Sequence, residues 1–170
     1  FVNDSSACGL GWLLNGLTDP AGRSAYGFNT VHYSCAVSNY SFVHELGHNM
    51  GLDHDRYVSP NPTLYPYAVG YVNLAGRWRT IMAYNNACVA QGFNCTRIGR
   101  FSNPDLSYNG APTGLPSSGP NPADNRQVLN NTQAFVASWK GAPGVPTITS
   151  VSPSSSSASV SFTPPAYVGA

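Results

Sequence analysis

The sequence predicts an α+β fold, and two kinds of segment predict it. Residues 10–14 (LGWLL) form a short apolar run, and residues 26–34 (YGFNTVHYS) are rich in β-branched and aromatic residues. Both are therefore expected to be strands. Residues 41–50 and the stretch after Asp124 instead have the end signals and apolar spacing of helices.

The first predicted helix comprises SFVHELGHNM, residues 41–50. Either Ser38 or Asn39 can cap its beginning, because their side chains accept hydrogen bonds from free backbone N–H groups. Gly51 marks its end, since glycine is the residue type favoured at a left-handed helix terminus. This helix carries most of the residues that could bind a metal or take part in catalysis.

The second predicted helix begins at the cap Asp124 and ends at Lys140-Gly141. Apolar residues fall near one of its faces, which we expect to close the core from below: Val128, Phe135, Val136 and Trp139. Between the two helices, residues 57–122 are dominated by Pro, Gly, Asn and Ser. Most of that stretch is expected to be ordered loop, with one compact apolar run at residues 80–84 (TIMAY).

Composition narrows the classes of function. With 170 residues, the chain is long enough for one domain and a small second unit. Charged residues make up 9% of it and the net charge is +1, so no basic surface for nucleic acid or an anionic membrane is expected. No apolar run approaches the roughly 20 residues needed to cross a bilayer. We expect a monomer that binds neither nucleic acid nor membrane.

The four cysteines point to an oxidising compartment. They form no CxxC pair and are even in number, which suits two disulfides, although three pairings are possible and four buried thiols are the alternative. We favour Cys88 with Cys95, which closes a short loop, and therefore Cys8 with Cys35. A secreted protein is the corresponding expectation, and the chain begins with Phe1 rather than Met.

Three histidines have the spacing of a metal site. On a helix, His44 and His48 lie on one face one turn apart, so both imidazoles can reach one ion. Gly51 permits the backbone reversal that brings His54 to a third corner. Glu45 points to the adjoining side, where it can reach a water on the metal. Three neutral nitrogen ligands leave one open position, which is typical of catalytic zinc.

These residues carry a family resemblance. HELGHNMGLDH, residues 44–54, resembles the HExxHxxGxxH signature of the metzincin metallopeptidases, and residues 80–84 resemble their Met-turn, with Met82 under the zinc site. Asp55 after the third histidine is similar to the adamalysin or reprolysin branch, whereas Tyr84 is similar to the astacin and serralysin pattern. The mixture resembles a bacterial reprolysin-like enzyme. The resemblance covers residues 8–140.

The resemblance implies a fold and a reaction. The fold is a zincin catalytic domain with a twisted mixed sheet, an active-site helix, a Met-turn and a C-terminal helix, here incomplete at its N-terminus. The reaction is hydrolysis of protein or peptide substrates by a zinc-activated water, with Glu45 as general base. Tyr84 would donate to the oxyanion, and the alternative is a packed tyrosine. Met82 is expected to be a hydrophobic floor rather than a ligand.

Some finer roles follow from the same resemblance. The segment 10–14 is similar to the edge strand that pairs with substrate in this clan, the alternative being a plain core strand. Arg97 or Arg100 could favour an acidic substrate residue on the leaving-group side. Asp55 is expected to support the zinc helix through hydrogen bonds to backbone, and His32 is expected to be structural. Calcium is possible, but the seven acidic residues of the chain give it no support.

The C-terminal stretch has a different character. Residues 142–146 form a linker by composition, which separates a partial catalytic domain (1–141) from residues 147–170. The latter resemble the opening strands of a fibronectin type III module and are too few to complete its β-sandwich, so we expect them to be extended and poorly ordered. The competing hypothesis for the whole chain is an inactive extracellular binding or adhesion module with a structural zinc.

Overall fold

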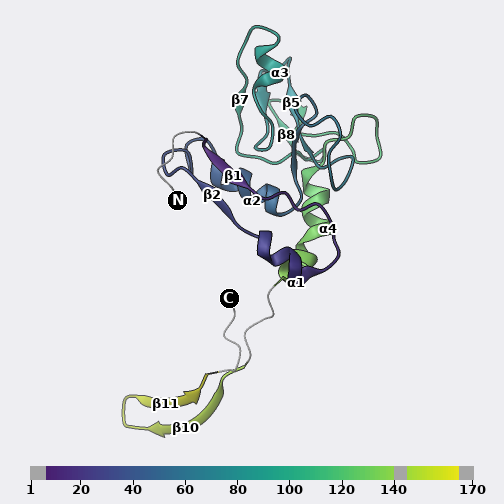
Figure 1. The fold of residues 1–170 in the computed structure, drawn as a ribbon. Helices are drawn as coiled ribbons and strands as arrows, with labels where there is room; N and C mark the ends of the chain where they lie inside the picture. Colours follow the sequence, from purple (N-terminus) through teal and green to yellow (C-terminus); the bar gives the residue numbers. More distant parts are fainter. Residues whose placement is uncertain (1–6, 140–144, 165–170) are drawn as a thin grey trace.

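In the part of the chain that the structure describes, strands and four α-helices make up the fold. The computed structural model describes residues 7–139 and 145–164. Its elements, in chain order and as labelled in Figure 1, are β1 (Gly9–Gly11), α1 (Pro20–Arg23), the 3-10 helix η1 (Ser24–Tyr26), β2 (Asn29–Val31), α2 (Ser41–Asn49), β3 (Asp53–Asp55), β4 (Val69–Gly70), β5 (Val72–Asn73), β6 (Trp78–Arg79), α3 (Asn86–Val89), β7 (Thr96–Arg97), β8 (Ser107–Tyr108), β9 (Ala111–Pro112), α4 (Asn125–Ala137), β10 (Thr147–Pro153) and β11 (Ala158–Thr163).

The expected mixed α and β architecture is present, but the expected single twisted sheet is not found among the described residues. β1 pairs with β2 antiparallel and β3 with β4 parallel. β6 lies between antiparallel β5 and parallel β7, and β8 pairs with β9. These strands have two or three residues each. The many Pro and Gly residues of the region explain this, because both interrupt strand ladders.

The N-terminal strands lie against the helix α2. The predicted strand 10–14 is only Gly9–Gly11, and the predicted strand 26–34 is only Asn29–Val31. Asn49, the last residue of α2 and 5% exposed, donates to the backbone oxygens of Trp12 and Phe28. Its side-chain oxygen accepts from Asn29. One buried amide therefore fixes both strands to the helix.

The helix α2 begins at Ser41, as predicted, but the predicted capping residue is not the one observed. Its cap position is Tyr40, at φ 56°, and no side chain caps the first turn. Ser38 instead donates its hydroxyl to the backbone oxygen of Ser34, so the prediction of Ser38 or Asn39 as cap is wrong. At the other end Gly51 has φ +88°, the left-handed conformation expected of it.

The helix α4 begins as predicted. The Asp124 side chain accepts from the backbone N–H of Gln127, the N-cap hydrogen bond. Val128 is fully buried, whereas Phe135, Val136 and Trp139 of the predicted apolar face are half-buried. The helix ends at Ala137, and the predicted end at 140–141 lies outside the described residues.

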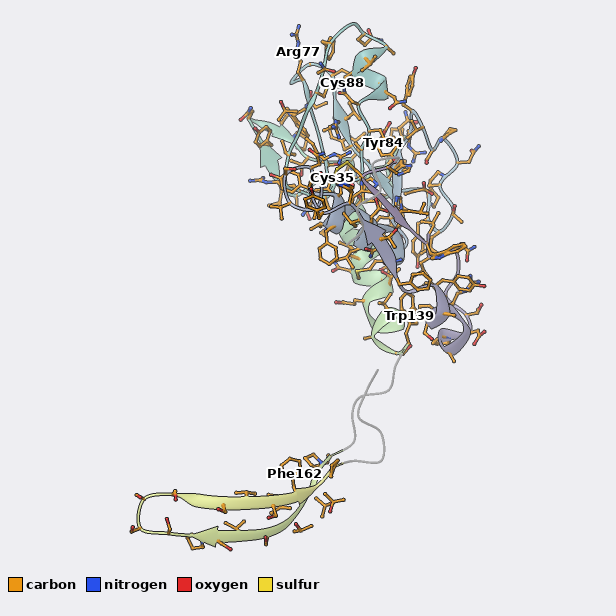
Figure 2. All side chains as sticks on the ribbon, turned by 60° about the vertical axis from the view of Figure 1, so that its left-hand side comes forward. Cys35, Arg77, Tyr84, Cys88, Trp139 and Phe162 are labelled. Carbon is orange, nitrogen blue, oxygen red and sulfur yellow. A yellow bond between two sulfur atoms is a disulfide. The ribbon has the colours of Figure 1, made fainter. Side chains whose placement is uncertain are left out.

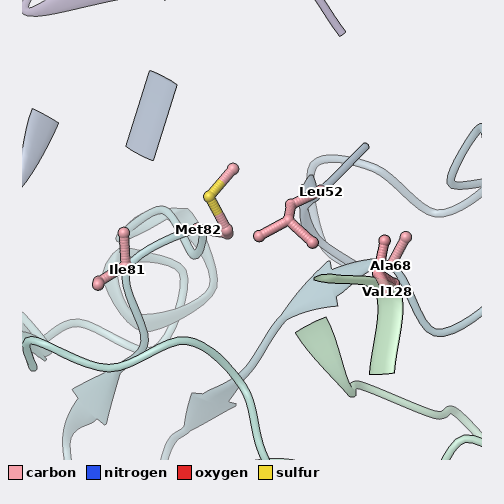
Figure 3. Close-up of a cluster of buried hydrophobic side chains, with 5 residues drawn as sticks. All are labelled: Leu52, Ala68, Ile81, Met82 and Val128. Atoms are coloured by element: carbon pink, nitrogen blue, oxygen red, sulfur yellow. The ribbon is translucent and has the colours of Figure 1, made fainter. Parts of the chain in front are cut away.

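The core lies between α2, the turn after β6, and α4. Figure 3 shows its buried members, which come from four separate stretches of the chain: Leu52, Ala68, Ile81, Met82 and Val128. Thr132 on α4 donates to the backbone oxygen of Met50 and so joins the two long helices. Leu52 and Met82 are 0% exposed, so the floor beneath α2 is apolar and closed to water.

Both expected disulfides are present. Cys8 pairs with Cys35, and Cys88 pairs with Cys95 across a separation of seven residues. Cys35 and Cys88 are labelled in Figure 2. The first disulfide joins the segment before β1 to the segment before α2. The second closes the loop between α3 and β7.

The C-terminal stretch forms a hairpin, with a register shift between Ile148 and Ser150, instead of the expected poorly ordered tail. β10 and β11 pair antiparallel, with Val151 opposite Val160 and Ile148 opposite Phe162. The strands expected from the alternating pattern are therefore found, and every residue in them is exposed. Most of the predicted linker 142–146 lies outside the described residues. No helix in the described part of the chain is long and apolar enough to cross a membrane.

Candidate active site

The structure brings His44, His48 and His54 together. The two helical histidines lie on one face of α2, and β3 supplies the third after the reversal at Gly51. One ring nitrogen from each lies within 4.8 Å of the others, and the Nε2 atoms of His48 and His54 are 3.1 Å apart. Within the described residues, the His, Cys, Asp or Glu side chains that lie close enough in groups of three or more to hold a metal ion are those of this cluster.

Hydrogen bonds orient the two helical imidazoles. Nδ1 of His44 lies 2.9 Å from the backbone oxygen of Ile81, and Nδ1 of His48 lies 2.8 Å from that of Leu52. A carbonyl only accepts, so each Nδ1 carries the hydrogen and leaves Nε2 with a free lone pair. Burial, the largest cause in each case, lowers the pKa of His44 to about 3, of His54 to about 4, and of His48 below its ordinary value.

This donor set fits a zinc ion. Tetrahedral coordination with bonds of about 2.0 Å places imidazole nitrogens about 3.3 Å apart, close to the separation found between His48 and His54. Neutral rings held by carbonyl acceptors are also the usual outer arrangement of zinc-binding histidines. With three protein ligands, a fourth coordination position stays open, as in catalytic rather than structural sites.

Glu45 lies beside the histidines and under β1. It is 6% exposed, and a Cβ placed on Gly9 would come within 2.5 Å of its Oε1. A Cβ on Gly11 would lie 2.9 Å from its backbone oxygen, so glycine is required for this close approach. Burial raises the pKa of Glu45 to about 7, and a hydrogen bond from the backbone of Gly11 partly opposes that rise.

The ring of Tyr84 covers one side of the histidine cluster. Its centroid lies 4.1 Å from that of His54 and 5.8 Å from that of His44. The residue is 38% exposed, so one part of it meets solvent. Burial of the remainder raises the pKa of its hydroxyl. Tyr84 therefore lies within reach of a substrate bound to the three imidazoles.

Met82 packs against α2, the helix that carries two of the three histidines. It is fully buried, and its Sδ would lie 2.6 Å from a Cβ on Gly47 of α2. The absence of a side chain at Gly47 thus lets the turn approach the helix. Met82 packs with Leu52 in the apolar core (Figure 3), which is the environment of a floor and not of a ligand.

Two buried aspartates fix the third histidine's strand. Oδ1 of Asp55 accepts from the backbone N–H of Tyr57, and Oδ2 accepts from that of Tyr84. Asp53 accepts from the backbone N–H of His54 and from Thr63. The predicted role of Asp55, bonding to backbone, agrees with this geometry. The sequence did not predict the role of Asp53, because the donor Thr63 lies in a loop ten residues further along the chain.

Arg97 and Arg100, both candidates for substrate selection, lie in different surroundings. Arg97 is half-buried, and its Nη1 donates to the backbone oxygen of Asn39 at the start of α2. Arg100 is exposed and donates to the backbone oxygen of Ser107. Of these two arginines, Arg97 lines a cavity at the N-terminal end of α2 and Arg100 does not. Arg79, which the sequence analysis did not select, lines the same cavity.

Comparison with known proteins identifies the family. Residues 1–102 match a reprolysin family model described as metallo-peptidase family M12. The chain belongs to this M12 metallopeptidase family. No solved structure shows a significant match to it. The expectation of a reprolysin-like metallopeptidase is thereby confirmed, and membership of this family implies a zinc cofactor, for which the three histidines provide a fitting donor set.

Several curated relatives of this M12 chain have the same name, peptidyl-Asp metalloendopeptidase. One from Stenotrophomonas maltophilia (strain R551-3) is 41% identical over 144 residues, and one from Xanthomonas campestris pv. campestris is 40% identical over 139. Each alignment covers 82% of this chain and 30% of the relative. One from Pseudomonas fragi is 38% identical over 109 residues, covering 62% of each. The chain thus spans about a third of the length of the first two relatives.

His32 is the one histidine outside the cluster. Its Nδ1 lies 2.8 Å from the hydroxyl of Ser34, and its ring stacks on Tyr33. Its neighbours are those of a structural histidine, as expected. Asn49 is a residue that the sequence analysis missed although it lies inside the histidine motif. Its place on the buried face of an amphipathic helix could have indicated this role, because buried polar side chains need hydrogen-bond partners.

Proposed function

We propose that this chain is the catalytic part of a zinc-dependent endopeptidase that uses Glu45 as its general base. One observation carries the proposal: the cluster of His44, His48 and His54 leaves a coordination position open, with the buried carboxyl of Glu45 beside it. A purely structural zinc would need a fourth protein ligand, and the described residues offer none.

The residues divide the work of peptide hydrolysis. His44 and His48 would hold the metal through Nε2, because their Nδ1 atoms are engaged by backbone carbonyls. When bound, zinc would supply Lewis acidity toward a water and a peptide carbonyl. The Glu45 carboxylate takes a proton from the attacking water and passes it to the amine nitrogen of the leaving peptide. No covalent bond between enzyme and substrate is required.

Two further roles complete the proposed site. The Tyr84 hydroxyl donates a hydrogen bond to the oxygen of the scissile carbonyl as negative charge develops there. Its ring lies over His54 on the exposed side of the cluster, which is where a substrate would enter. The turn at Met82 acts as the Met-turn of a metzincin-type domain. It keeps the underside of the histidines apolar.

The edge of β1 is the proposed binding strip for extended substrate. β1 pairs with β2 on one side and lies directly above Glu45. A peptide added as another strand there would place its backbone across the catalytic groups. The proposed substrates are proteins and peptides with an aspartate at the cleavage site, because the relatives of 38–41% identity are named for that residue.

We propose an extracellular location and a two-part chain. The disulfides Cys8–Cys35 and Cys88–Cys95 suit an oxidising compartment. The catalytic part occupies residues 1–141, and the hairpin of β10 and β11 is the start of a fibronectin type III-like unit. Its alternating pattern and exposed faces suit strands that pack on a further sheet.

The decisive experiment combines metal analysis with a peptide library. The wild-type chain is expected to bind one zinc per molecule and to cleave peptides, with activity lost to a chelator and restored by zinc. Glu45→Ala is expected to keep the zinc and to lose activity by at least about 100-fold. Bound zinc with no cleavage of any peptide would instead support an inactive binding module. Full activity in Glu45→Ala would refute Glu45 as the base.

A further inference from the structure

A polar cavity of about 370 Å³ opens beside the helix that carries His44 and His48. It lies at the N-terminal end of α2, next to the Cys8–Cys35 disulfide and the strands β6 and β7. The residues that line it are Cys8, Ser38, Asn39, Tyr40, Ser41, Arg79 and Arg97. Two of these are cations, and none is an acid.

The two guanidinium groups are held in place by backbone carbonyls. Nη1 of Arg79 donates to the backbone oxygen of Ala83 at 2.6 Å, and its Nε donates to that of Cys95. Arg97 donates through Nη1 to Asn39 and, at 3.4 Å, through Nη2 to Ala83. Bonds to the main chain of separate segments fix both side chains before any ligand arrives. A preorganised cation costs less entropy to bind an anion.

Neither arginine has a carboxylate within ion-pair distance among the described residues, although Asp55 acts on Arg79 and Glu45 on Arg97 from farther away. Within the described part of the chain, the ion pairs closer than 4.0 Å are those of Arg126 with Asp105 and Asp124. Nε of Arg97 is buried and has no hydrogen-bond partner. Burial lowers the pKa of Arg79 to about 10, and the charge of Arg97 adds to that effect. Two half-buried cations that share a cavity and have no carboxylate in ion-pair contact favour an incoming anion.

The cavity adjoins the reacting groups. Ala83, whose oxygen receives both arginines, lies directly between Met82 and Tyr84. The charge of Arg97 acts on Glu45 and on Tyr84, which places the guanidinium within electrostatic range of both. A substrate side chain adjacent to the scissile bond would therefore reach this cavity while its carbonyl lies at the three imidazoles.

We propose that Arg97, with Arg79 beside it, selects an acidic side chain at the substrate residue that follows the scissile bond. This inference rests on the proposed peptidase function and names the residues that give it specificity. The cavity has room for one carboxylate side chain and bridging water, and the free Nε–H of Arg97 supplies an unused donor. Hydrogen bonds between a guanidinium and a carboxylate are charge-assisted and geometrically specific.

The test compares two peptides that differ in one residue. Both are fluorogenic and identical, except that Asp or Asn follows the scissile bond. For the zinc-loaded full chain we expect kcat/KM to be at least about tenfold higher for the Asp peptide, since a charged hydrogen bond contributes about 1.5–3 kcal/mol. Arg97→Gln is expected to reduce that ratio at least tenfold, and Arg79→Gln to reduce it by a smaller factor.

Two further variants distinguish the loss of a specific contact from a general loss of folding. Arg97→Lys keeps the charge and is expected to retain part of the preference for Asp. Arg100→Gln is the matched control, because Arg100 is exposed, is bonded to Ser107 and lies outside the cavity. It should leave the Asp-to-Asn ratio unchanged. Circular dichroism and zinc content would be measured for every variant.

Several outcomes would overturn the inference while leaving the peptidase intact. They are a wild type with equal kcat/KM for the two peptides, an Arg97→Gln variant with an unchanged ratio, and an Arg100→Gln variant that removes the preference. If the wild type cleaves neither peptide, the proposed function has failed instead. Fluorescence anisotropy with the same two peptides then tests the cavity, and equal affinity for Asp and Asn peptides would refute it.

Discussion

The carboxylate of Asp55 accepts a hydrogen bond from the backbone N–H of Tyr84 at 2.8 Å, across 29 residues of chain. This hydrogen bond joins the strand that carries His54 to the turn that carries Tyr84. A second bond, from the backbone of Tyr57, occupies the other carboxylate oxygen. Asp55 is 2% exposed, so both bonds are protected from water. The placement of His54 relative to Tyr84 thus depends on the side chain of Asp55.

Replacing Asp55 is therefore expected to destabilise the protein and its metal site together. Asp55→Ala leaves two backbone donors unpaired, and the expected loss in free energy of unfolding is about 2 kcal/mol or more. Asp55→Asn keeps one accepting oxygen and should lose roughly half as much. Zinc affinity should fall about tenfold in Asp55→Ala. Denaturant unfolding and zinc titration measure the two effects.

The matched control for this prediction is Asp105→Asn. Asp105 is exposed and pairs with Arg126 at the surface, so its replacement should change the free energy of unfolding by less than about 0.5 kcal/mol. Equal stability of Asp55→Ala and wild type would show that the hydrogen bond to Tyr84 does not join the two segments in solution.

Gly47→Ala should weaken the fold even though alanine is the better helix former. The added Cβ would lie 2.6 Å from Sδ of Met82 and 3.2 Å from Cδ1 of Leu52, both fully buried. Overpacking costs about 1–3 kcal/mol, against a gain in helix propensity of about 1 kcal/mol. A lower midpoint in denaturant unfolding is the expected result.

A double-mutant cycle identifies the cause of that loss. If the crowding comes from Met82, Gly47→Ala should cost less in a Met82→Ala background, where the space is free. Strict additivity of the two changes would mean that the methionine does not press against the helix.

Gly9→Ala tests the placement of the general base. Its Cβ would come within 2.5 Å of Oε1 and 2.7 Å of Cγ of Glu45, so the carboxylate must move. A shift of about 1 Å in a reacting group can cost about 100-fold in rate, and we expect kcat to fall by 10- to 100-fold. Zinc content should stay at one per chain, because Gly9 does not contact the histidines' ligand atoms.

The control for the change at Gly9 is Gly119→Ala. Its Cβ meets only the backbone oxygen of Pro116, at an ordinary 3.4 Å, so kcat should stay at the wild-type value. An unchanged kcat in Gly9→Ala would mean that Glu45 tolerates displacement and would weaken its assignment as the base.

The sequence predicted the parts of the site that depend on local spacing. His44 and His48 share a helix face, and Gly51 reverses the chain toward His54, so geometry within eleven residues was sufficient. Asp124 was found as a cap for the same reason. Arg79 was missed because its role depends on the parallel pairing of β6 with β7, which brings Trp78 opposite Thr96 and Arg79 opposite Arg97. Nothing local in the sequence encodes that pairing.

The sheets were predicted less well than the helices. Segments of mixed apolar and aromatic residues, such as 26–34, resemble longer strands, yet the strand itself covers only Asn29–Val31, and His32 adds one backbone hydrogen bond to Cys8. The strand β2 ends where the chain turns toward Cys35 and its disulfide with Cys8. Strand length depends on the partner strand and on such distant links, and a sequence pattern contains neither.

Met82 provides the last prediction, since its sulfur packs against α2 at Gly47, a position between the two helical histidines in sequence. Met82→Leu conserves volume and should lose less than about 1.5 kcal/mol of stability, whereas Met82→Ala leaves a cavity and should lose about 2–5 kcal/mol. Both variants should still bind one zinc, because the three imidazoles supply the ligands. Denaturant unfolding and metal analysis of both variants check this. Loss of zinc from a folded Met82→Leu protein would mean that the thioether takes a direct part in holding the metal.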